Sequence, residues 1–461
     1  MRALRSQFFL TYILLAAVGV YIPVLLDKQL AGVALDFTLA ARTVHLGSQE
    51  IKGVILAFNG LAIVLAPVLM AWLADTRFRV RTLLAWSFFV CFLGAGLLAW
   101  AGRLPPGGTG LVAALSAGYI LYTFAVRPQG TLQDGLYFAE AHATEARGQK
   151  PAPYASVRIF GSLGYLVPLL ALGAYAAYEN HHGRDMPMWL PMLAGSAVAV
   201  MAVANTLGLP LSEMPAREGK GLPTLEAAAQ VSRFGAWPMF WGMSLVHAGT
   251  IAYFSYQPTF LKQNCGLPED WISWVPALDV LLELVPMLFA PWMVERFGAK
   301  KVLLAAVLMQ GARYVAFALA PALVAPWCAW MHLDADSVAG RAPMWAAIGF
   351  KGLLHGPIIV GLYVVPPILL NRMATPTCRS STQALYTMLS VGGGVLVGNL
   401  VFGAVAQHLG LPAVFLGSAG LMVVGAALLL RGRWSGLPPA EPAVAEEARA
   451  RPAASSAETD T

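Results

Sequence analysis

Apolar runs long enough to cross a lipid bilayer recur along almost the whole of this 461-residue chain. They limit its possible folds more than any other feature. A membrane-spanning helix needs about 20 apolar residues, whereas a barrel strand needs about 10. Backbone groups in lipid have no water to bond, so each segment must satisfy its own hydrogen bonds, as a helix does. The sequence therefore predicts an all-α membrane protein.

The composition agrees with a lipid environment. Charged residues make up 12% of the chain and hydrophobic residues 58%, whereas a soluble domain is about 25% charged. The net charge of +6 does not indicate a nucleic-acid partner, because the basic residues lie in short loops between apolar runs. We expect the lipid bilayer as the partner of this surface and no nucleic acid.

The apolar runs indicate about twelve helices in two sets of six. The first set is predicted at 8–26, 51–74, 83–101, 110–128, 157–178 and 188–211, and the second at 239–262, 271–294, 301–321, 344–370, 380–406 and 411–431.

Polar segments divide the chain around these sets. Residues 1–211 form a predicted amino-terminal half, 212–236 a polar cytoplasmic linker, and 237–432 a carboxy-terminal half. The tail 433–461 is rich in Pro, Ala, Glu and Ser and is predicted to be disordered. Residues 27–50 form an enlarged external segment.

Basic residues predict the orientation in the membrane. With the amino end inside, Lys and Arg concentrate in the predicted cytoplasmic segments, as in Arg77, Arg79 and Arg81. Fewer fall at external edges, to which we assign Lys52 and Lys351. Cytoplasmic loops carry an excess of Lys and Arg. The chain is therefore predicted to cross the inner membrane many times, with both termini in the cytoplasm.

A weak internal repeat supports two related halves. Asp75 and Glu295 both follow an apolar span and a tryptophan, 220 residues apart, and Arg158 and Arg379 both open a span, 221 residues apart. Transporters built from repeats bind their substrate between the halves, near the middle of the bilayer. The repeat favours a solute carrier.

Ionisable residues within predicted spans are candidates for function, because burying them in lipid costs several kcal/mol unless they are paired or hydrated. Asp279 and Glu283 share one helix face at i and i+4. Glu283 lies among apolar residues, and such surroundings favour the neutral form of a carboxyl. We predict that Glu283, with Asp279, takes up and releases protons. A packing hydrogen bond, or a salt bridge to Arg313 or Arg127, is the alternative.

A second polar group is predicted where the fourth span ends and the fifth begins. Arg127 and Asp134 are seven residues apart, and Arg158 follows at the mouth of the fifth span. Asp134 is a further proton-coupling candidate and Arg158 a substrate-binding candidate. The alternative is an ion pair between Asp134 and Arg158 that holds two helices together.

Two other sets of residues are candidates for substrate contact and for gating. Aromatic rings with polar tips suit the faces of sugars or bases, and such residues in the seventh and tenth spans are Tyr253, Tyr256, Gln257 and Tyr363. At predicted cytoplasmic helix ends, Asp75 and Glu295 are expected to pair with Arg79 or Arg296 and to latch a gate.

No sequence feature favours catalysis or a cofactor. Phosphate-binding loops, zinc-ligand spacings and nucleophile motifs are absent from the sequence. The four cysteines show no metal-ligand spacing. We predict no enzyme activity, no cofactor and no metal. A polytopic enzyme or a membrane sensor is the alternative of a different class.

Several segments together resemble the nucleoside:proton symporter family of the major facilitator superfamily. They are 157–164, Glu283 with 291–303, Arg313–Tyr314, Leu354–Gly356, 379–384, and the glycines Gly392, Gly393, Gly394 and Gly398. The resemblance implies the twelve-helix major facilitator fold and proton-coupled uptake. It also implies a site that uses the arginine of the fifth helix and the glutamate of the eighth, here Arg158 and Glu283.

This sequence departs from the family pattern near the expected substrate. Ile251 and Phe254 stand where the family often has amides or tyrosines, and Val360 where it has an acid. Asp134 stands where that branch has an amide, which is similar to the lactose and phenylpropionate permease branches. The sequence thus predicts a monomeric secondary transporter for protons and a small polar solute, a nucleoside first. An oligosaccharide or aromatic acid is the alternative.

Overall fold

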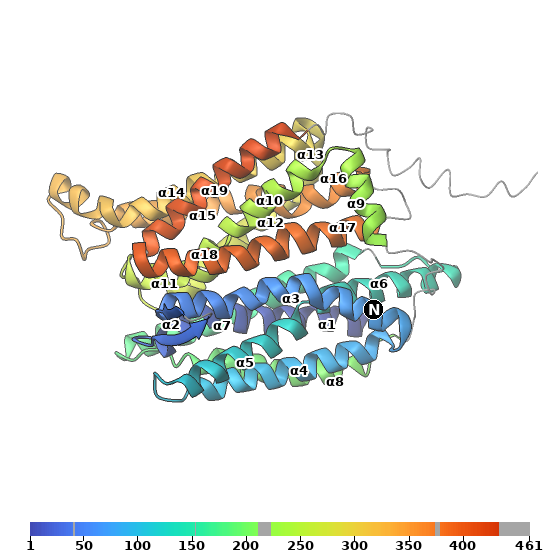
Figure 1. Cartoon of the computed structure of the whole chain (residues 1–461), viewed down its shortest axis with the longest axis horizontal. Coiled ribbons are helices and arrows are strands. Elements are labelled where there is room, and N and C mark those ends of the chain that lie inside the picture. The colour runs from blue at the N-terminus through green and yellow to red at the C-terminus, as the bar shows by residue number, and fades with distance from the viewer. Residues whose placement is uncertain (40–41, 153, 211–222, 374–378, 433–461) are drawn as a thin grey trace, which may run out of the picture.

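The computed structural model describes residues 1–39, 42–152, 154–210, 223–373 and 379–432. The described chain consists of long helices that run side by side in two bundles, as Figure 1 shows. The first bundle holds the amino-terminal segments and the second the carboxy-terminal ones. The predicted tail lies outside the described residues.

The amino-terminal bundle is helical except for one hairpin. Its helices are α1 (Arg2–Gly19), α2 (Ile22–Gln29), α3 (Ser48–Thr76), α4 (Val80–Ala101), α5 (Thr109–Val126), α6 (Gln129–Ala146), α7 (Tyr154–His181) and α8 (Trp189–Thr206).

The carboxy-terminal bundle follows the short helix α9 (Pro223–Arg233), which lies within the predicted linker. Its helices are α10 (Trp237–Gly249), α11 (Gln257–Gln263), α12 (Trp271–Leu288), α13 (Ala290–Phe297), α14 (Ala299–Met331), α15 (Ala342–Ile359), α16 (Val365–Met373), α17 (Arg379–Tyr386), α18 (Gly393–Leu409) and α19 (Leu411–Arg431). Three short π-helical segments join some of them, η1 (Ala252–Tyr256), η2 (Val360–Val364) and η3 (Thr387–Gly392).

Eleven helices of the described chain are long and apolar enough to span a membrane. The seventh predicted span corresponds to α10, η1 and α11, which run in succession from Trp237 to Gln263 but are interrupted by η1. Pro258 and Pro366 follow η1 and η2 closely. Because proline lacks an N–H, it removes a helical hydrogen bond at each place, and a π-helical turn accommodates the loss. The prediction of about twelve spanning helices is confirmed.

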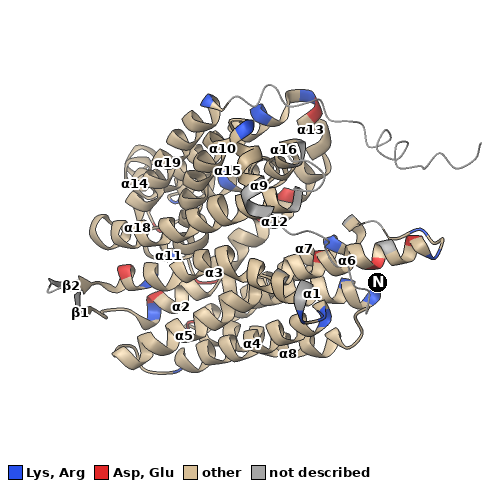
Figure 2. Cartoon of the chain, turned by 45° about the vertical axis from the view of Figure 1, so that its right-hand side comes forward, with Lys and Arg blue, Asp and Glu red and all other residues tan. Residues whose placement is uncertain are grey.

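The external segment 27–50 contains the one departure from an all-α chain among the described residues. Strands β1 (Leu35–Leu39) and β2 (Arg42–Leu46) pair antiparallel, with Leu35 opposite Leu46. The hairpin projects from one end of the amino-terminal bundle, as Figure 2 shows. The sequence interpretation gave this segment no structure. We use "hairpin end" below for this end of the molecule.

The bundle surface is suited to lipid. Large apolar side chains are exposed along the helices, among them Leu65, Leu69 and Phe89. Figure 2 shows that charged residues are sparse on the helices and gather near their ends. Exposed tryptophans such as Trp100 and Trp330 stand at or near helix ends, where amphipathic rings favour the membrane interface. The chain is a multi-pass membrane protein.

Each bundle encloses its own hydrophobic core. One core cluster draws its buried residues from 4–209, with Ile272 and Ala277 added from the other bundle. The other cluster draws on 231–429, with Ile63 added. The helix pairs α3 with α18 and α7 with α12 make close contacts between the bundles. Two packed units that share a limited interface can shift relative to one another.

Glycines allow α3 and α18 to approach closely across the bundle interface. A Cβ on Gly53 would lie 2.6 Å from the Asn399 carbonyl oxygen and 2.9 Å from the Gly403 Cα, and one on Gly60 would collide with the backbone of Leu396. In lipid, the hydrophobic effect does not drive helices together, so they associate through close van der Waals contact, which small residues allow. Backbone-to-backbone packing therefore holds the two bundles together here.

We predict that Gly60→Ala destabilises this arrangement by about 1–3 kcal/mol, because the added methyl group meets backbone that cannot rotate away. Thermal unfolding in detergent should show a lower Tm for Gly60→Ala than for wild type. Gly349→Ala is the control, since nothing lies within 4 Å of a Cβ at that position. Equal Tm values for the two variants would contradict the role given to this contact.

Candidate transport site

A buried ion pair lies at the centre of the carboxy-terminal bundle. Lys351 on α15 forms a very short ion pair with Asp279 on α12, and their side chains are 2% and 1% exposed. The Tyr253 hydroxyl on η1 donates to the same Asp279 oxygen at 2.9 Å. The Lys351 ammonium also lies 5.0 Å from the centre of the Tyr253 ring. Residues from α12, α15 and η1 thus meet at one ion pair whose charges cancel.

A histidine joins this pair to a second carboxylate and to an arginine. On α15, His355 Nε2 lies 3.3 Å from a Glu283 carboxylate oxygen, and its Nδ1 lies 3.1 Å from Arg313 Nη1 on α14. The His355 ring stacks on Tyr253 at 5.6 Å between centroids. Arginine can only donate, so Nδ1 accepts, and Nε2 carries the hydrogen that is directed at Glu283.

Two of the three predicted proton-coupling acids, Asp279 and Glu283, have different surroundings in the structure. Asp279 is fully buried and paired, whereas the Glu283 side chain is 19% exposed and contacts His355. The predicted alternative of a salt bridge from this acidic pair to Arg313 or Arg127 is not found among the described residues. Arg313 instead contacts His355 and lies 4.9 Å from the centre of the Tyr253 ring.

Sequence reasoning missed Lys351, which it assigned to an external edge. That assignment is wrong, because Lys351 lies within α15 and is covered on all sides. Lys52 was misplaced in the same way and lies fully buried in α3. A signal was present, since each lysine stands next to a glycine within a predicted apolar span, Lys52 at its start and Lys351 in its interior. A lysine in that setting needs a buried partner.

The amino-terminal bundle carries a second polar group. Arg158 on α7 makes a very short hydrogen bond to the Tyr12 hydroxyl, and its guanidinium lies 4.4 Å from the centre of that ring. Asp134 on α6 instead accepts a hydrogen bond from Tyr154 at 2.6 Å. No ion pair between Asp134 and Arg158 is found in the described chain, so the predicted alternative of a direct pair is wrong.

The remaining polar candidates have different degrees of burial. Arg127, at the end of α5, donates to Asn59 on α3 at 2.6 Å. Tyr256 and Gln257 are buried where η1 meets α11, and the Tyr256 hydroxyl has no hydrogen-bond partner among described residues. Tyr363 on η2 is 41% exposed. It is the most open of the predicted substrate-binding tyrosines.

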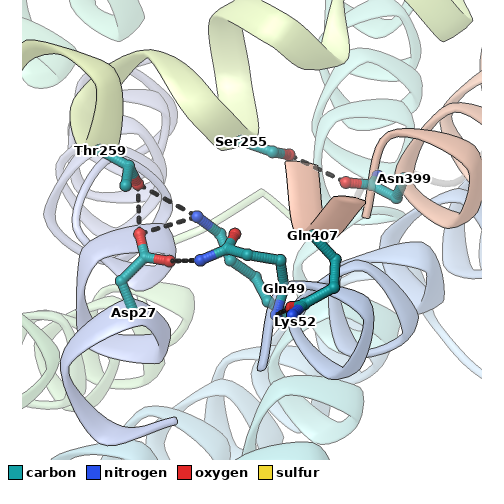
Figure 3. Close-up of polar contacts among 7 residues, drawn as sticks. All are labelled: Asp27, Gln49, Lys52, Ser255, Thr259, Asn399 and Gln407. Atoms are coloured by element: carbon teal, nitrogen blue, oxygen red, sulfur yellow. Dashed lines mark hydrogen bonds and ion pairs between the residues drawn. The ribbon is translucent and has the colours of Figure 1, made fainter. Parts of the chain in front are cut away.

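Polar side chains connect the two bundles at the hairpin end, as Figure 3 shows. Lys52 on α3 forms a 2.8 Å ion pair with Asp27 on α2, and it donates to Thr259 on α11 at 3.1 Å. Thr259 also donates to Asp27 in a very short bond. Nearby, the Gln49 N–H donates to the Gln407 side chain at 3.0 Å. The opposite bundle therefore covers a buried ion pair of the amino-terminal bundle.

Four charged residues form a ring beside this network. Lys28 lies 2.7 Å from Glu269 and 3.3 Å from Asp185, and Lys262 contacts the same two carboxylates. Lys28 and Asp185 belong to one bundle, Lys262 and Glu269 to the other. The hydrogen bonds and ion pairs that we find between described residues of the two bundles lie at this end.

The predicted gate residues stand at the opposite end. The carboxyl end of α3, α13 and the start of α4 lie there. Glu295 and Arg296 are both exposed on α13, and no ion pair between them is found in the described chain. Their predicted pairing is therefore not present in this arrangement. The side chain of Asp75 lies outside the described residues, and Arg79 has an interaction partner. The pairing of Asp75 with Arg79 stays a prediction.

Two helix bundles with ionisable groups buried at their interiors, joined at one end, define the chain as a membrane transporter rather than an enzyme. A family model for the MFS_1 like family matches residues 41–416. The chain belongs to this family of the major facilitator superfamily.

Relatives agree with this class. The chain is 22% identical over 358 residues, which is 77% of its length and 76% of the relative's, to "Putative nucleoside transporter YegT" of Escherichia coli (strain K12). Its fold matches that of a mutant of the nucleoside transporter NupG with a TM-score of 0.73, at 17% identity, over 94% of this chain and 99% of that one. A bacterial homolog of the lysosomal transporter Spinster matches with a TM-score of 0.60, at 14% identity, over 94% and 96%.

We predict that Lys351→Met destabilises the protein by about 3–5 kcal/mol, because it leaves Asp279 buried without a counter-charge. The double variant Lys351→Met with Asp279→Leu should recover most of this loss in thermal unfolding. Arg341→Gln is the control, since its partner Asp336 is 86% exposed and such surface pairs contribute about 1 kcal/mol or less. A double variant as unstable as Lys351→Met would contradict the assignment.

We also predict that closure of the hairpin end resists mild acid. Asp185 lies in the loop between α7 and α8, where partial burial acts to raise its pKa, but Lys28 and Lys262 outweigh burial and hold that pKa below the usual value of 3.8. A lowered pKa means that this stabilisation is fully present above the usual value and is lost as the pH falls through the lowered one.

Spin labels at His182→Cys and Val338→Cys, one on each bundle, report this closure. Their distance distribution should stay the same from pH 8 to pH 5 and change only below about pH 4. In an Asp185→Asn background, the change that arises from this carboxyl should be missing. A shift between pH 7 and pH 5 that depends on Asp185 would overturn the prediction.

Proposed function

We propose that this protein imports a nucleoside together with protons by alternating access. In this proposal it lies in the inner membrane with both termini in the cytoplasm, and a monomer is the working unit. The observation that carries the proposal is the contact between His355 and Glu283, which lies within the spanning helices and is tied to Arg313. The similarity to YegT and NupG, which are described as nucleoside transporters, supports the solute class.

The geometry supports Glu283 as the proton carrier. Its carboxylate is partly exposed, so a proton can reach it, whereas Asp279 is fully enclosed by Lys351 and Tyr253. When Glu283 binds a proton it loses its charge, and the hydrogen bond that it accepts from the Nε2–H of His355 weakens. His355, which also contacts Arg313, can then turn toward solute. Binding of a proton would in this way alter the side chains that meet the solute.

The position of the connections between the bundles supports alternating access. The bundles are joined by polar contacts at the hairpin end, which lies on the external side of the membrane in the proposed orientation. Rocking of one bundle against the other would break these contacts and form new ones at the other end. Glu295, Arg296, Arg79 and Asp75 stand where the new contacts would form.

The proposed solute contacts fall into two groups. Arg158 and Tyr363 are accessible in part in the present arrangement, one from each bundle. Tyr256 and Gln257 are covered by neighbouring side chains, whereas Tyr253 is half-buried. Tyr256 and Gln257 would meet solute only after the hairpin end opens, which assigns them to its entry and assigns Arg158 and Tyr363 to its release.

A permease for an aromatic acid is the second candidate, and Arg158 favours it. Within the described chain no carboxylate lies within 4.0 Å of the Arg158 guanidinium, whose hydrogen-bond partner is a tyrosine. A cation in that setting suits an anionic solute. Competition for labelled uridine by unlabelled nucleosides, oligosaccharides and aromatic acids separates the alternatives.

We predict that Glu283→Gln exchanges labelled solute across proteoliposomes at a rate near that of wild type but does not accumulate it. Glutamine keeps the shape and hydrogen bonds of a protonated glutamate but cannot release a proton. The measurement is uptake of labelled uridine and adenosine with and without an inward proton gradient. Asp336→Asn, an exposed acid in the loop before α15, is the matched control. Accumulation by Glu283→Gln under the gradient would rule out this carboxyl as the proton carrier.

A further inference from the structure

A pocket of about 180 Å³ lies inside the carboxy-terminal bundle, and none of the functional assignments above uses it as a whole. It is formed where α10, η2 with α16, and α17 with η3 come together. The residues around it are His247, Leu362, Tyr363, Pro367, Leu370, Gln383, Tyr386, Thr387 and Val391.

The polar part of the pocket wall is built from rigid groups. His247 is buried, and its Nε2 lies 3.3 Å from the Tyr386 hydroxyl. The Tyr363 and Tyr386 rings stand edge-on to His247, with centroids at 5.9 and 6.3 Å. Three aromatic rings thus form a corner with fixed geometry. Rings of this kind recognise flat aromatic ligands by stacking and edge contacts.

The backbone around the pocket departs from regular helix on two sides. Tyr363 belongs to η2 and Thr387 to η3, and π-helical turns occur frequently at functional sites. On the third side α10 is held in place, because a Cβ on Gly398 would lie 2.5 Å from the Ala248 carbonyl oxygen. The two pocket walls formed by η2 and η3 therefore have irregular backbone, and they face a third wall, α10, that is firmly packed.

The size of the pocket limits its occupant. Its volume of about 180 Å³ is less than the roughly 300 Å³ of pockets that enclose a drug-sized ligand, but it suits one ring system. Leu362, Leu370 and Val391 supply apolar surfaces. Thr387 and Gln383 supply groups that donate and accept hydrogen bonds.

The pocket is also connected to the candidate transport site. Tyr363 is 41% exposed at its edge, and η2, which carries it, packs against α14, the helix of Arg313 in the charged cluster. A solute between the bundles could therefore insert one part into the pocket while another part remains near the charged residues.

We propose that this pocket receives the planar nitrogen heterocycle of the transported solute, with His247, Tyr386 and Thr387 as specificity-determining contacts. The inference rests on the proposed nucleoside transport and assigns the base, rather than the sugar, to the pocket. The sugar then faces the charged cluster. Heterocycles with ring nitrogens and carbonyl groups match the polar edge, and their flat faces match the apolar walls.

The test is counterflow exchange of labelled uridine in proteoliposomes, with free uracil and free ribose as competitors. Thr387→Val keeps the shape of the pocket and removes one hydroxyl, which should raise the half-saturating concentration by about threefold to tenfold. Thr387→Phe fills the pocket and should raise it by about tenfold or more. His182→Phe, on an exposed loop, is the control. Gel filtration of each variant confirms that it is folded.

The competitors show which part of the solute the pocket holds. In wild type, free uracil should inhibit exchange, and in both Thr387 variants this inhibition should weaken while that by ribose stays the same. Suppose that a folded Thr387→Val protein shows unchanged inhibition by uracil and an unchanged half-saturating concentration. This result would overturn the proposed role of the pocket and leave the proposal of nucleoside transport intact. Failure of folded wild type to exchange any nucleoside would overturn both.

Discussion

The structure depends on how it neutralises charge inside a medium that cannot solvate it. An unpaired ion in the bilayer interior is too costly to retain, so each buried cation of the described spans has a specific partner. Lys351 is bound by Asp279, Lys52 by Asp27, and Arg313 by His355 and the ring of Tyr253. These partners come from different helices, so a charge is neutralised only when the helices that carry the two partners pack together. A helix that moves must carry its partner with it or exchange it for another.

The two lysines illustrate two ways of using such a pair. Asp279 and Lys351 come from α12 and α15 within a single bundle and are enclosed by that bundle's own residues. Asp27 and Lys52 also belong to a single bundle, but Thr259 of the other bundle completes their enclosure. The first pair therefore stabilises a bundle, and the second stabilises the contact between bundles. The two pairs thus differ in one partner residue, Thr259, and this residue ties the stability of the Asp27–Lys52 pair to the conformation in which the two bundles meet.

The sequence predicted the fold well because hydropathy shows which segments are apolar and long enough to cross a bilayer, and counts of basic residues separate the loops on its two sides. The twelve spans followed from such patterns, the family from the resemblance of several segments, and the acids at 279 and 283 from their place inside a predicted span. The misplaced lysines show where this reasoning stops, since a hydropathy window treats Lys52 and Lys351 as ends of spans when specific partners hold them inside. The partner of Glu283 depends on how α12, α14 and α15 are arranged, which a linear pattern does not encode. The hairpin and the pocket beside η2 and η3 depend on the same three-dimensional information.

The contacts at the hairpin end differ in their exposure, and this has a consequence for the medium in which the protein works. The ring of Lys28, Asp185, Lys262 and Glu269 includes side chains that are up to 65% exposed, and mobile ions screen charges in contact with water. Lys52 is wholly enclosed and beyond their reach. Ionic strength can therefore weaken or strengthen the contribution of the exposed ring to the closure of this end, but not the contribution of the enclosed Lys52 ion pair. A cell in dilute surroundings would hold the same protein shut more firmly than a cell in brine.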